Sequence, residues 1–190
     1  RFGNKAGLTP NLDSLYRRSV AFDRMIACGN RTVRGLEALT LSIPPSAGQS
    51  LIKRPEQKER RSIGSVLRER GYRTMFFYGG KSYFDNMGPF FAGNGYEVID
   101  KDSYKPEEIK FSNIWGVCDE DSYDRMLTDL NATAREGKPF FAHMMTISNH
   151  RPYTYPEGRI AIPPTSKSRE GGVMYADYAL GRFMRMAARK

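Results

Sequence analysis

The chain has 190 residues, of which 39% are hydrophobic and 12% aromatic, so its composition is that of a globular domain rather than a disordered or fibrous protein. No run of 18 apolar residues occurs, so no membrane-spanning segment is expected within these residues. A net charge of +9 favours an anionic partner, such as a phosphate ester, an anionic lipid or a nucleic acid.

The first predicted elements are a helix and a strand. Thr9 and Pro10 are typical of a helix start, because proline is tolerated at the first helical position, and a short helix is expected over residues 8–19. The apolar run VAFDRMIACG predicts a strand over residues 20–29 that ends at Gly29.

Helical spacing returns after this strand and ends at two prolines, Pro44 and Pro45. The apolar positions that define this second helix are Val33, Leu36, Leu39 or Thr40, and Ile43. A basic run at residues 53–61 contains two glutamates, and we interpret it as a solvated loop, with a contact to a membrane surface or polyanion as the alternative. Residues 62–71 predict another short helix.

Strand patterns alternate with helices in the rest of the chain. Residues 72–80 and 96–100 have the length and apolar character of short strands, and residues 138–150 form the strongest predicted strand, with an apolar centre typical of burial on both faces. Between them, an amphipathic helix ending at Gly137 is marked by Tyr123, Met126, Leu127, Leu130 and Ala134. A last helix has one apolar side made by Val173, Ala176, Leu180, Phe183 and Ala187.

This alternation predicts an α/β fold, with a mostly parallel sheet covered by helices on both faces. The chain begins in mid-pattern, and its last helix lacks a stop signal. We therefore expect residues 1–190 to form a single partial domain, truncated at both ends. Two cysteines, Cys28 and Cys118, suit neither a disulfide-rich scaffold nor a zinc cluster, and the sequence leaves open whether they pair.

Ligands of such sheets bind beyond the carboxyl ends of the strands, which singles out the loops CGNRT, YGGKSYFDNM and SNHRPY. In the first loop, Thr32 precedes a helix, where unpaired amides and the helix dipole favour an anion, and Arg31 and Arg34 add positive charge. Thr32 is interpreted either as a nucleophile or anion contact, or as a simple N-cap. Because Gly35 stands where a capping box would have Glu or Gln, no capping box is expected.

The other two loops also carry polar side chains that admit two interpretations. Asp85 and Asn86, after the paired glycines of the second loop, are expected either to touch substrate hydroxyls or to cap a helix. His150, in the third loop, is either a ligand of the substrate or an incidental polar residue.

The motifs resemble those of a known family. TPNLDSL followed by VAF is similar to the opening segment of the sulfatase and alkaline phosphatase superfamily. Five further phrases resemble, in order, the sulfatase-like phosphoglycerol transferases of bacterial envelopes, the lipoteichoic acid synthase group: NRTVRGLEALTLSIPP, YGGKSYFDNM, WGVCDED, FFAHMMTISNHRPY and YADYALGRF. The resemblance covers nearly the whole chain and is most specific in NRTVRGLE and TISNHRPY. It implies an alkaline phosphatase-like sulfatase fold.

The resemblance implies a catalytic mechanism. Thr32 would be both the nucleophile and a ligand of a divalent metal ion, with Mn, Mg, Ca and Zn not distinguished. The threonine would attack a phosphodiester such as the glycerol phosphate head group of an anionic lipid, and a glycan hydroxyl would accept the group. Water as the acceptor would make the protein a hydrolase. His150 would line the substrate pocket and contact the phosphate or move a proton, whereas His143 lies within a strand and is expected to be structural.

Some positions depart from the family pattern. Tyr78 and Met87 stand where relatives that transfer glycerol phosphate have histidine and arginine, which leaves the head group open. In WGVCDED, Trp115 is expected to pack, and Asp119 with Glu120 to begin a helix on its positive end.

The remaining metal ligands of the family would precede position 1 and follow position 190. The 190 residues alone are therefore expected to be inactive. The parent protein is expected to carry a membrane anchor and to place this domain outside the cytoplasm.

Other functions have their own signatures. A formylglycine sulfatase would show Cys-x-Pro-Ser-Arg, which is absent although Cys28 lies near the expected place. A phosphoethanolamine transferase would lack the RGLE continuation. An inactive binding module would show no turnover even with the flanking sequence restored. Nucleic-acid binding is disfavoured, because aromatic residues do not interleave with the basic run.

Overall fold

The computed structural model describes residues 4–189, which divide into two compact units. Unit 1 consists of the residues up to Asp23, Tyr104–Thr128, and the residues from Thr146 onward; unit 2 consists of Arg24–Ser103 and Asp129–Met145. Each unit thus combines segments that are far apart in the sequence.

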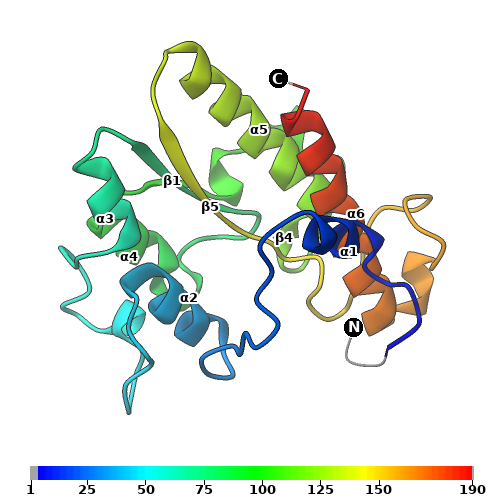
Figure 1. Ribbon diagram of the computed structural model, residues 1–190, viewed down its shortest axis with the longest axis horizontal. Helices are drawn as coiled ribbons and strands as arrows, with labels where there is room; N and C mark the ends of the chain where they lie inside the picture. The colour runs from blue at the N-terminus through cyan, green and yellow to red at the C-terminus, as the bar shows by residue number, and fades with distance from the viewer. Residues whose placement is uncertain (1–3, 190) are drawn as a thin grey trace. The chain divides into compact units, whose positions relative to one another are not determined.

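Unit 2 contains a parallel sheet. Its strands are β1 (Arg73–Tyr78), β2 (Glu97–Ile99) and β5 (Phe140–Met145), in the order β2-β1-β5. The neighbouring strands β1 and β5 are labelled in Figure 1. Both neighbours run parallel to β1, as the alternation of strands and helices predicts. The central strand is the most deeply buried, because neighbours on both edges and helices on both faces exclude water from it.

Helices cover both faces of this sheet. On one face, Phe91 of α4 (Met87–Gly93) stacks on Phe76 of β1 with ring centroids 3.7 Å apart, and its ring meets His143 of β5 edge to face. On the other face, the Arg73 guanidinium donates to the Thr133 hydroxyl, 2.6 Å away, in the last turns of α5 (Asp119–Arg135). The predicted layer arrangement is therefore confirmed.

The remaining helices of unit 2 lie before and between the strands in the sequence. They are α2 (Thr32–Leu41), α3 (Ile63–Arg68) and the short 3-10 helices η1 (Leu51–Lys53), η2 (Phe84–Asn86) and η3 (Lys101–Ser103). Ser62 and Ser65 form a capping box at the start of α3. Helix α2 ends before Ile43, because Ser42 adopts a left-handed conformation (φ 58°) that breaks the helical path.

Unit 1 is built around helix α6 (Arg169–Ala187). It also contains α1 (Pro10–Arg17), the antiparallel pair β3 (Ser112–Asn113) and β4 (Gly116–Val117), the first turns of α5, and the short helices η4 (Pro106–Glu108) and η5 (Pro164–Ser166). The buried Asp177 carboxylate of α6 accepts hydrogen bonds from the Asn11 and Leu12 amides and so holds the first turn of α1.

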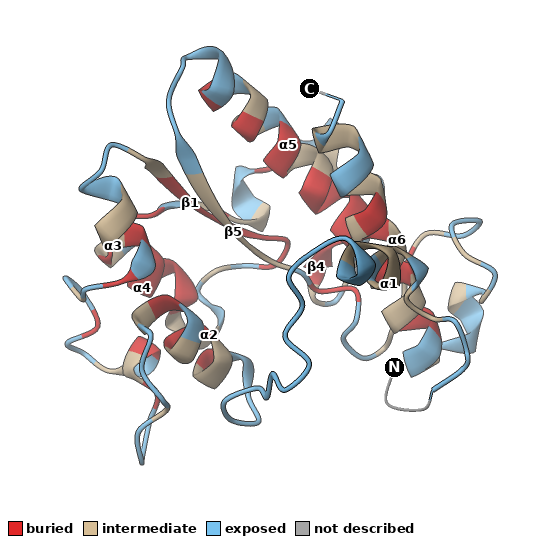
Figure 2. Cartoon of the chain, viewed as in Figure 1, coloured by how far each residue is buried: buried red, intermediate tan, exposed pale blue. Residues whose placement is uncertain are grey.

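The strand predicted over residues 20–29 is absent from the structure. The segment joins α1 to α2 as an irregular, exposed stretch (Figure 2), and the side chains of Val20 and Ile26 are 86% and 83% exposed. An apolar run becomes a strand only where a neighbouring strand satisfies its backbone hydrogen bonds. Within residues 4–189, no strand pairs with this segment.

Burial of the strongest predicted strand also differs from expectation. Among residues 4–189, β5 pairs with β1 alone, and its side chains are exposed or half-buried rather than buried on both faces; Phe140 is 38% exposed. An edge strand has a neighbour on one side only, so its side chains are covered less completely than those of a central strand.

The buried side of α6 is not the predicted apolar stripe. The predicted residues, Val173, Ala176, Leu180, Phe183 and Ala187, are half-buried. The buried positions are instead Gly171, Gly172, Tyr175, Asp177, Ala179 and Gly181. Small residues allow close packing here: a Cβ on Gly181 would lie 2.2 Å from the Asn11 side chain.

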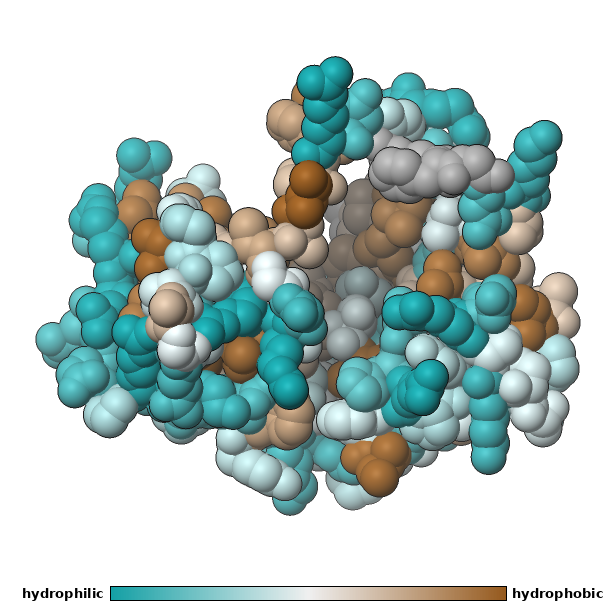
Figure 3. All heavy atoms as spheres, turned by 90° about the horizontal axis from the view of Figure 1, so that it is seen from below, coloured by the Kyte–Doolittle hydropathy of each residue, from teal (hydrophilic) through white to brown (hydrophobic). Residues whose placement is uncertain are grey.

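Hydrophilic side chains cover most of the face seen in Figure 3, with separate hydrophobic patches among them. Such a surface is typical of a globular domain in contact with water. Within the described residues, no helix combines the length and the apolar character needed to cross a bilayer.

Candidate active site

Thr32 is the first residue of α2, and its side chain is exposed. The structure makes Arg31 the N-cap, with an extended backbone (φ −129°, ψ 150°) and no side-chain capping bond. The interpretation of Thr32 as an N-cap is therefore wrong. The Thr32 hydroxyl makes no hydrogen bond to any residue that the structure describes.

The start of α2 is electrostatically positive. The first amides bonded within the helix are those of Arg34 and Gly35, which donate to the Arg31 carbonyl at 2.9 and 3.3 Å. The amides of Thr32 and Val33 precede them, at the end of the helix where the dipole is positive. This arrangement favours a negatively charged group beside the Thr32 hydroxyl.

The two arginines beside Thr32 have different surroundings. Arg31 is exposed and forms no ion pair within residues 4–189. The Arg34 guanidinium instead contacts the Glu37 carboxylate at 3.2 Å and donates to the Ser46 carbonyl at 2.9 Å. Of the two cations that the sequence places near the hydroxyl, Arg31 is the one without a competing partner.

Glu37, in the RGLE motif, is a residue whose role the sequence analysis missed. Its side chain is fully buried, and it accepts a hydrogen bond from the Ser50 hydroxyl at 2.8 Å as well as from Arg34. These contacts hold α2 against the segment that leads into η1. The signal in the sequence was a glutamate on the apolar side of a helix, between Leu36 and Thr40.

Asp85 and Asn86 bring the loop after β1 to η1. Both have left-handed backbones, with φ of 51° and 61°. The Asp85 carboxylate pairs with the Lys53 ammonium at 2.8 Å, and the Asn86 amide donates to the Ile52 carbonyl at 2.7 Å. Asn86 occupies the N-cap position of α4 without a side-chain capping bond, so side-chain capping is not observed.

Tyr78 ends β1 at the base of this loop. Burial raises its pKa to about 12, and the negative charge of Asp85 contributes in the same direction. The hydroxyl is therefore neutral at physiological pH and cannot supply a phenolate base there.

His150 belongs to unit 1, whereas Thr32, Arg31, Asp85 and Asn86 belong to unit 2. The His150 ring is exposed and lies on the indole of Trp115, with ring centroids 3.9 Å apart. Its Nδ1 atom is 3.1 Å from the Arg151 carbonyl oxygen, which also accepts a hydrogen bond from Trp115 Nε1.

Asp119 anchors the loop that carries His150. Its side chain is 1% exposed, and one carboxylate oxygen accepts hydrogen bonds from the amides of Ile147 and Ser148 at 3.0 and 2.9 Å. In return, the Asp119 amide donates to the Ser148 hydroxyl. Burial raises the pKa of the carboxyl group. The expected helix start at Asp119 and Glu120 is confirmed by α5.

His143 and the cysteines are not part of this arrangement. His143 lies within the sheet beside Phe76 and Phe91, where burial lowers its pKa, in keeping with a structural role. Both cysteines are free: Cys28 is exposed, and Cys118 is buried with its pKa raised to about 12.

A metal site is not formed by the described residues alone. Among residues 4–189, no three His, Cys, Asp or Glu side chains are grouped so that they could hold an ion. Thr32 offers one neutral oxygen, whereas divalent ions require several ligands, most of them anionic or imidazole groups. The residues present therefore do not fit a metal ion without further ligands.

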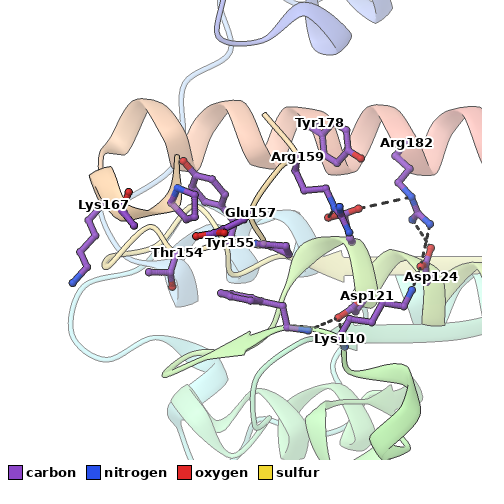
Figure 4. A pocket seen from close by; sticks show the side chains of 15 residues that line it. Lys110, Asp121, Asp124, Thr154, Tyr155, Glu157, Arg159, Lys167, Tyr178 and Arg182 are labelled. Carbon is purple, nitrogen blue, oxygen red and sulfur yellow. Dashed lines mark hydrogen bonds and ion pairs between the residues drawn. The ribbon is translucent and has the colours of Figure 1, made fainter. Parts of the chain in front are cut away.

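A pocket of about 750 Å³ lies elsewhere in unit 1 (Figure 4). Arg182 and Arg159 point toward carboxylates of α5: Arg182 pairs with Asp124, and Arg159 Nε lies 2.9 Å from Glu120. None of the predicted site residues lines this pocket. Because these two arginines are already paired with carboxylates, their charges are not free for an anion in the pocket.

A protein-family model described as Sulfatase matches residues 2–190. Phosphoglycerol transferase I of Xanthomonas campestris pv. campestris is 27% identical over 159 residues, which cover 77% of this chain and 22% of that protein. The chain therefore spans about a fifth of the length of this curated relative.

Two solved structures are similar along almost the whole chain. A protein in the alkaline phosphatase superfamily from Vibrio parahaemolyticus is 41% identical with a TM-score of 0.90, and the match covers 96% of this chain and 45% of that one. The lipoteichoic acid synthase LtaP from Listeria monocytogenes is 20% identical with a TM-score of 0.83, over 96% and 46% of the respective chains. Together with the parallel sheet, these matches confirm the expected fold class.

Proposed function

The chain belongs to the sulfatase family, and from this we propose that it forms part of a phosphoglycerol transferase of the bacterial envelope that uses Thr32 as its nucleophile. The matches confirm the family resemblance drawn from the sequence motifs. The observation that carries the proposal is the exposed Thr32 hydroxyl at the start of α2, without a hydrogen-bond partner among the described residues and next to an unpaired arginine.

The proposed reaction has two steps. The Thr32 oxygen bonds to the phosphorus of a glycerol phosphate head group, the bond from phosphorus to the diacylglycerol oxygen breaks, and the hydroxyl proton ends on that leaving oxygen. An acceptor hydroxyl on a glycan then bonds to the phosphorus, the bond to Thr32 breaks, and the threonine recovers a proton. With water as the acceptor, the same site would hydrolyse the donor.

The other candidate residues have distinct proposed roles. Arg31 and the amides at the start of α2 stabilise the charge on the phosphate. Asp85 and Asn86 accept hydrogen bonds from glycerol hydroxyls. One Asp85 oxygen and the Asn86 side-chain oxygen are available for this, because neither bonds to a described residue. The other Asp85 oxygen and the Asn86 side-chain nitrogen bind η1. His150 contacts the phosphate or transfers a proton.

The resemblance implies that a divalent metal ion is the cofactor of the full-length protein. Thr32 would be one ligand, and the others would come from outside these 190 residues. Such an ion would lower the pKa of the threonine hydroxyl. We expect the parent protein to be anchored in the membrane and to place this domain outside the cytoplasm. The net charge of +9 suits an anionic lipid head group as the partner. The proposal includes no nucleic-acid partner.

Intact-protein mass spectrometry tests the nucleophile. Full-length protein incubated with a divalent ion and phosphatidylglycerol should gain a phosphoglyceryl group on Thr32, and Thr32→Ala should lose both the adduct and turnover. Thr32→Ser keeps a hydroxyl and should keep a measurable adduct. Thr128→Ala, which removes an exposed threonine of α5, is the matched control and should behave as the native protein.

Three results would contradict the proposal. Full turnover by Thr32→Ala would remove the nucleophile from the mechanism. Absence of turnover in the intact native protein with any divalent ion would favour a binding module that retains the fold without the chemistry. Release of free glycerol phosphate in place of transfer to an acceptor would identify a hydrolase.

A further inference from the structure

The Arg151 carbonyl oxygen accepts two hydrogen bonds at the end of the loop that carries His150. One donor is Trp115 Nε1, and the other partner is His150 Nδ1, 3.1 Å away. A carbonyl oxygen only accepts hydrogen bonds, so the Nδ1 atom must carry the proton in this contact. In the neutral ring, Nε2 is then unprotonated and has a free lone pair.

The position of Trp115 is itself determined by neighbouring residues. Its backbone amide donates to the Asn113 side-chain oxygen at 2.8 Å, and the Asn113 amide donates to the Thr154 hydroxyl at 3.1 Å. The His150 ring lies on this indole at an interplanar angle of 49°. The contact limits rotation of the imidazole, while the indole N–H fixes the carbonyl that binds Nδ1.

We propose that Trp115 is a positioning residue that holds His150 in the tautomer with a protonated Nδ1, so that Nε2 accepts a hydrogen bond from a substrate hydroxyl. Nε2 makes no hydrogen bond to any residue that the structure describes, and the side chain is exposed. A neutral ring in this tautomer cannot donate from Nε2 to an ionised phosphate oxygen. Of the two roles open to His150, the geometry therefore favours accepting a proton over contacting phosphate.

This inference rests on the proposed function for the identity of the substrate hydroxyl, whereas the tautomer is a property of the protein without substrate. Nitrogen NMR of full-length protein labelled with ¹⁵N-histidine measures that tautomer directly. The spectrum of His150→Gln assigns the signals. The native protein should show the proton on Nδ1 at a pH where the ring is neutral, whereas free neutral histidine favours Nε2.

Two substitutions separate the contributions of the indole. Trp115→Phe retains an aromatic ring but removes the N–H, and the tautomer should shift toward protonated Nε2. Trp115→Leu also removes the ring and should shift it further. In transfer assays, Trp115→Phe should lower kcat by about tenfold, with KM changed by less than about twofold, because proton transfer is impaired while binding is retained.

The outcomes distinguish this inference from the proposed function. A native protein with the proton on Nε2 would overturn the inference even if Trp115→Phe failed to fold. An unchanged tautomer in folded Trp115→Phe would overturn the positioning role of the tryptophan. The expected tautomer together with no adduct on Thr32 would instead leave the positioning intact and remove the transferase function.

Discussion

Arg31 and Arg34 flank the Thr32 hydroxyl, but their surroundings assign them different tasks. Arg31 is exposed and unpaired within residues 4–189, so its charge is available to a bound phosphate. Arg34 is engaged with the fully buried Glu37, so its charge supports the fold. Substitution of Arg31 is thus expected to change activity, whereas substitution of Arg34 is expected to change stability.

Substitution of each arginine by alanine tests this division. Arg34→Ala leaves a buried carboxylate with fewer donors and should lower the free energy of unfolding by about 1–3 kcal/mol. Arg31→Ala should change that free energy by less than about 0.5 kcal/mol, yet reduce kcat/KM about tenfold or more. Chemical denaturation and steady-state assays of the full-length protein provide the two measurements. Equal loss of stability in both variants would contradict the assignment.

At the scale of elements, the first turn of α5 and the loop after β5 are joined through one carboxyl group. Asp119 accepts from the amides of Ile147 and Ser148, and its second oxygen is buried without a partner among the described residues. A buried carboxylate with an unsatisfied oxygen is costly in its charged form. The stability of the contact between α5 and the loop that carries His150 is thus expected to depend on whether Asp119 is protonated.

The pH dependence of stability tests this expectation. Because burial raises the folded-state pKa of Asp119 above its ordinary value of 3.8, the folded protein keeps this proton at pH values where the unfolded chain has lost it. Its contribution to stability is full below that ordinary value and is lost as the pH rises through the raised pKa. Asp119→Asn cannot titrate, so its free energy of unfolding should gain on that of the native protein as the pH rises above the ordinary value of 3.8.

A second substitution separates charge from hydrogen bonding at this junction. Asp119→Ala also removes the acceptor for both amides and should be less stable than Asp119→Asn by about 2–3 kcal/mol at every pH, measured by chemical denaturation, because neither variant titrates at this position. If the difference between the native protein and Asp119→Asn did not vary with pH, the raised pKa would be wrong.

At the scale of the whole molecule, the net charge of +9 is the property that bears on a lipid substrate. The basic residues are distributed along the chain, and several are already paired with carboxylates, as Arg73 is with Glu97 and Arg182 with Asp124. A distributed excess of charge attracts an anionic surface without specifying a head group, and this attraction is screened by salt.

Vesicle co-sedimentation tests the role of this charge. Full-length protein, reconstituted in detergent-free nanodiscs to shield any anchor, should associate with phosphatidylglycerol vesicles more strongly than with phosphatidylcholine vesicles. Raising the salt from about 0.1 M to about 1 M, which shortens the Debye length from roughly 10 Å to roughly 3 Å, should abolish most of that preference. Equal association with both lipids at low salt would contradict it.

Prediction from the sequence succeeded where the signals are local. Two glycines, Gly71 and Gly137, each mark the end of a helix, and the apolar run between Arg73 and Tyr78 marks the central strand. Each of these signals depends on interactions within a few residues. It failed for residues 20–29, because an apolar run does not reveal whether another strand will pair with it. The same limitation applies to β5, whose composition suits a central strand although it pairs with only one strand among residues 4–189.

The motifs in the sequence were enough to identify the family, the alternation of helices with parallel strands from residue 62 onward, and the residue types at the candidate site, because these depend on local patterns and on motifs in a defined order. Three contacts became known from the three-dimensional fold: Arg34 pairs with Glu37, Asp85 and Asn86 bind η1, and Trp115 lies against His150. These contacts depend on which segments meet and on how their side chains are oriented, and no local sequence pattern specifies either. Which charges and lone pairs remain free for a ligand is therefore known only from the folded chain.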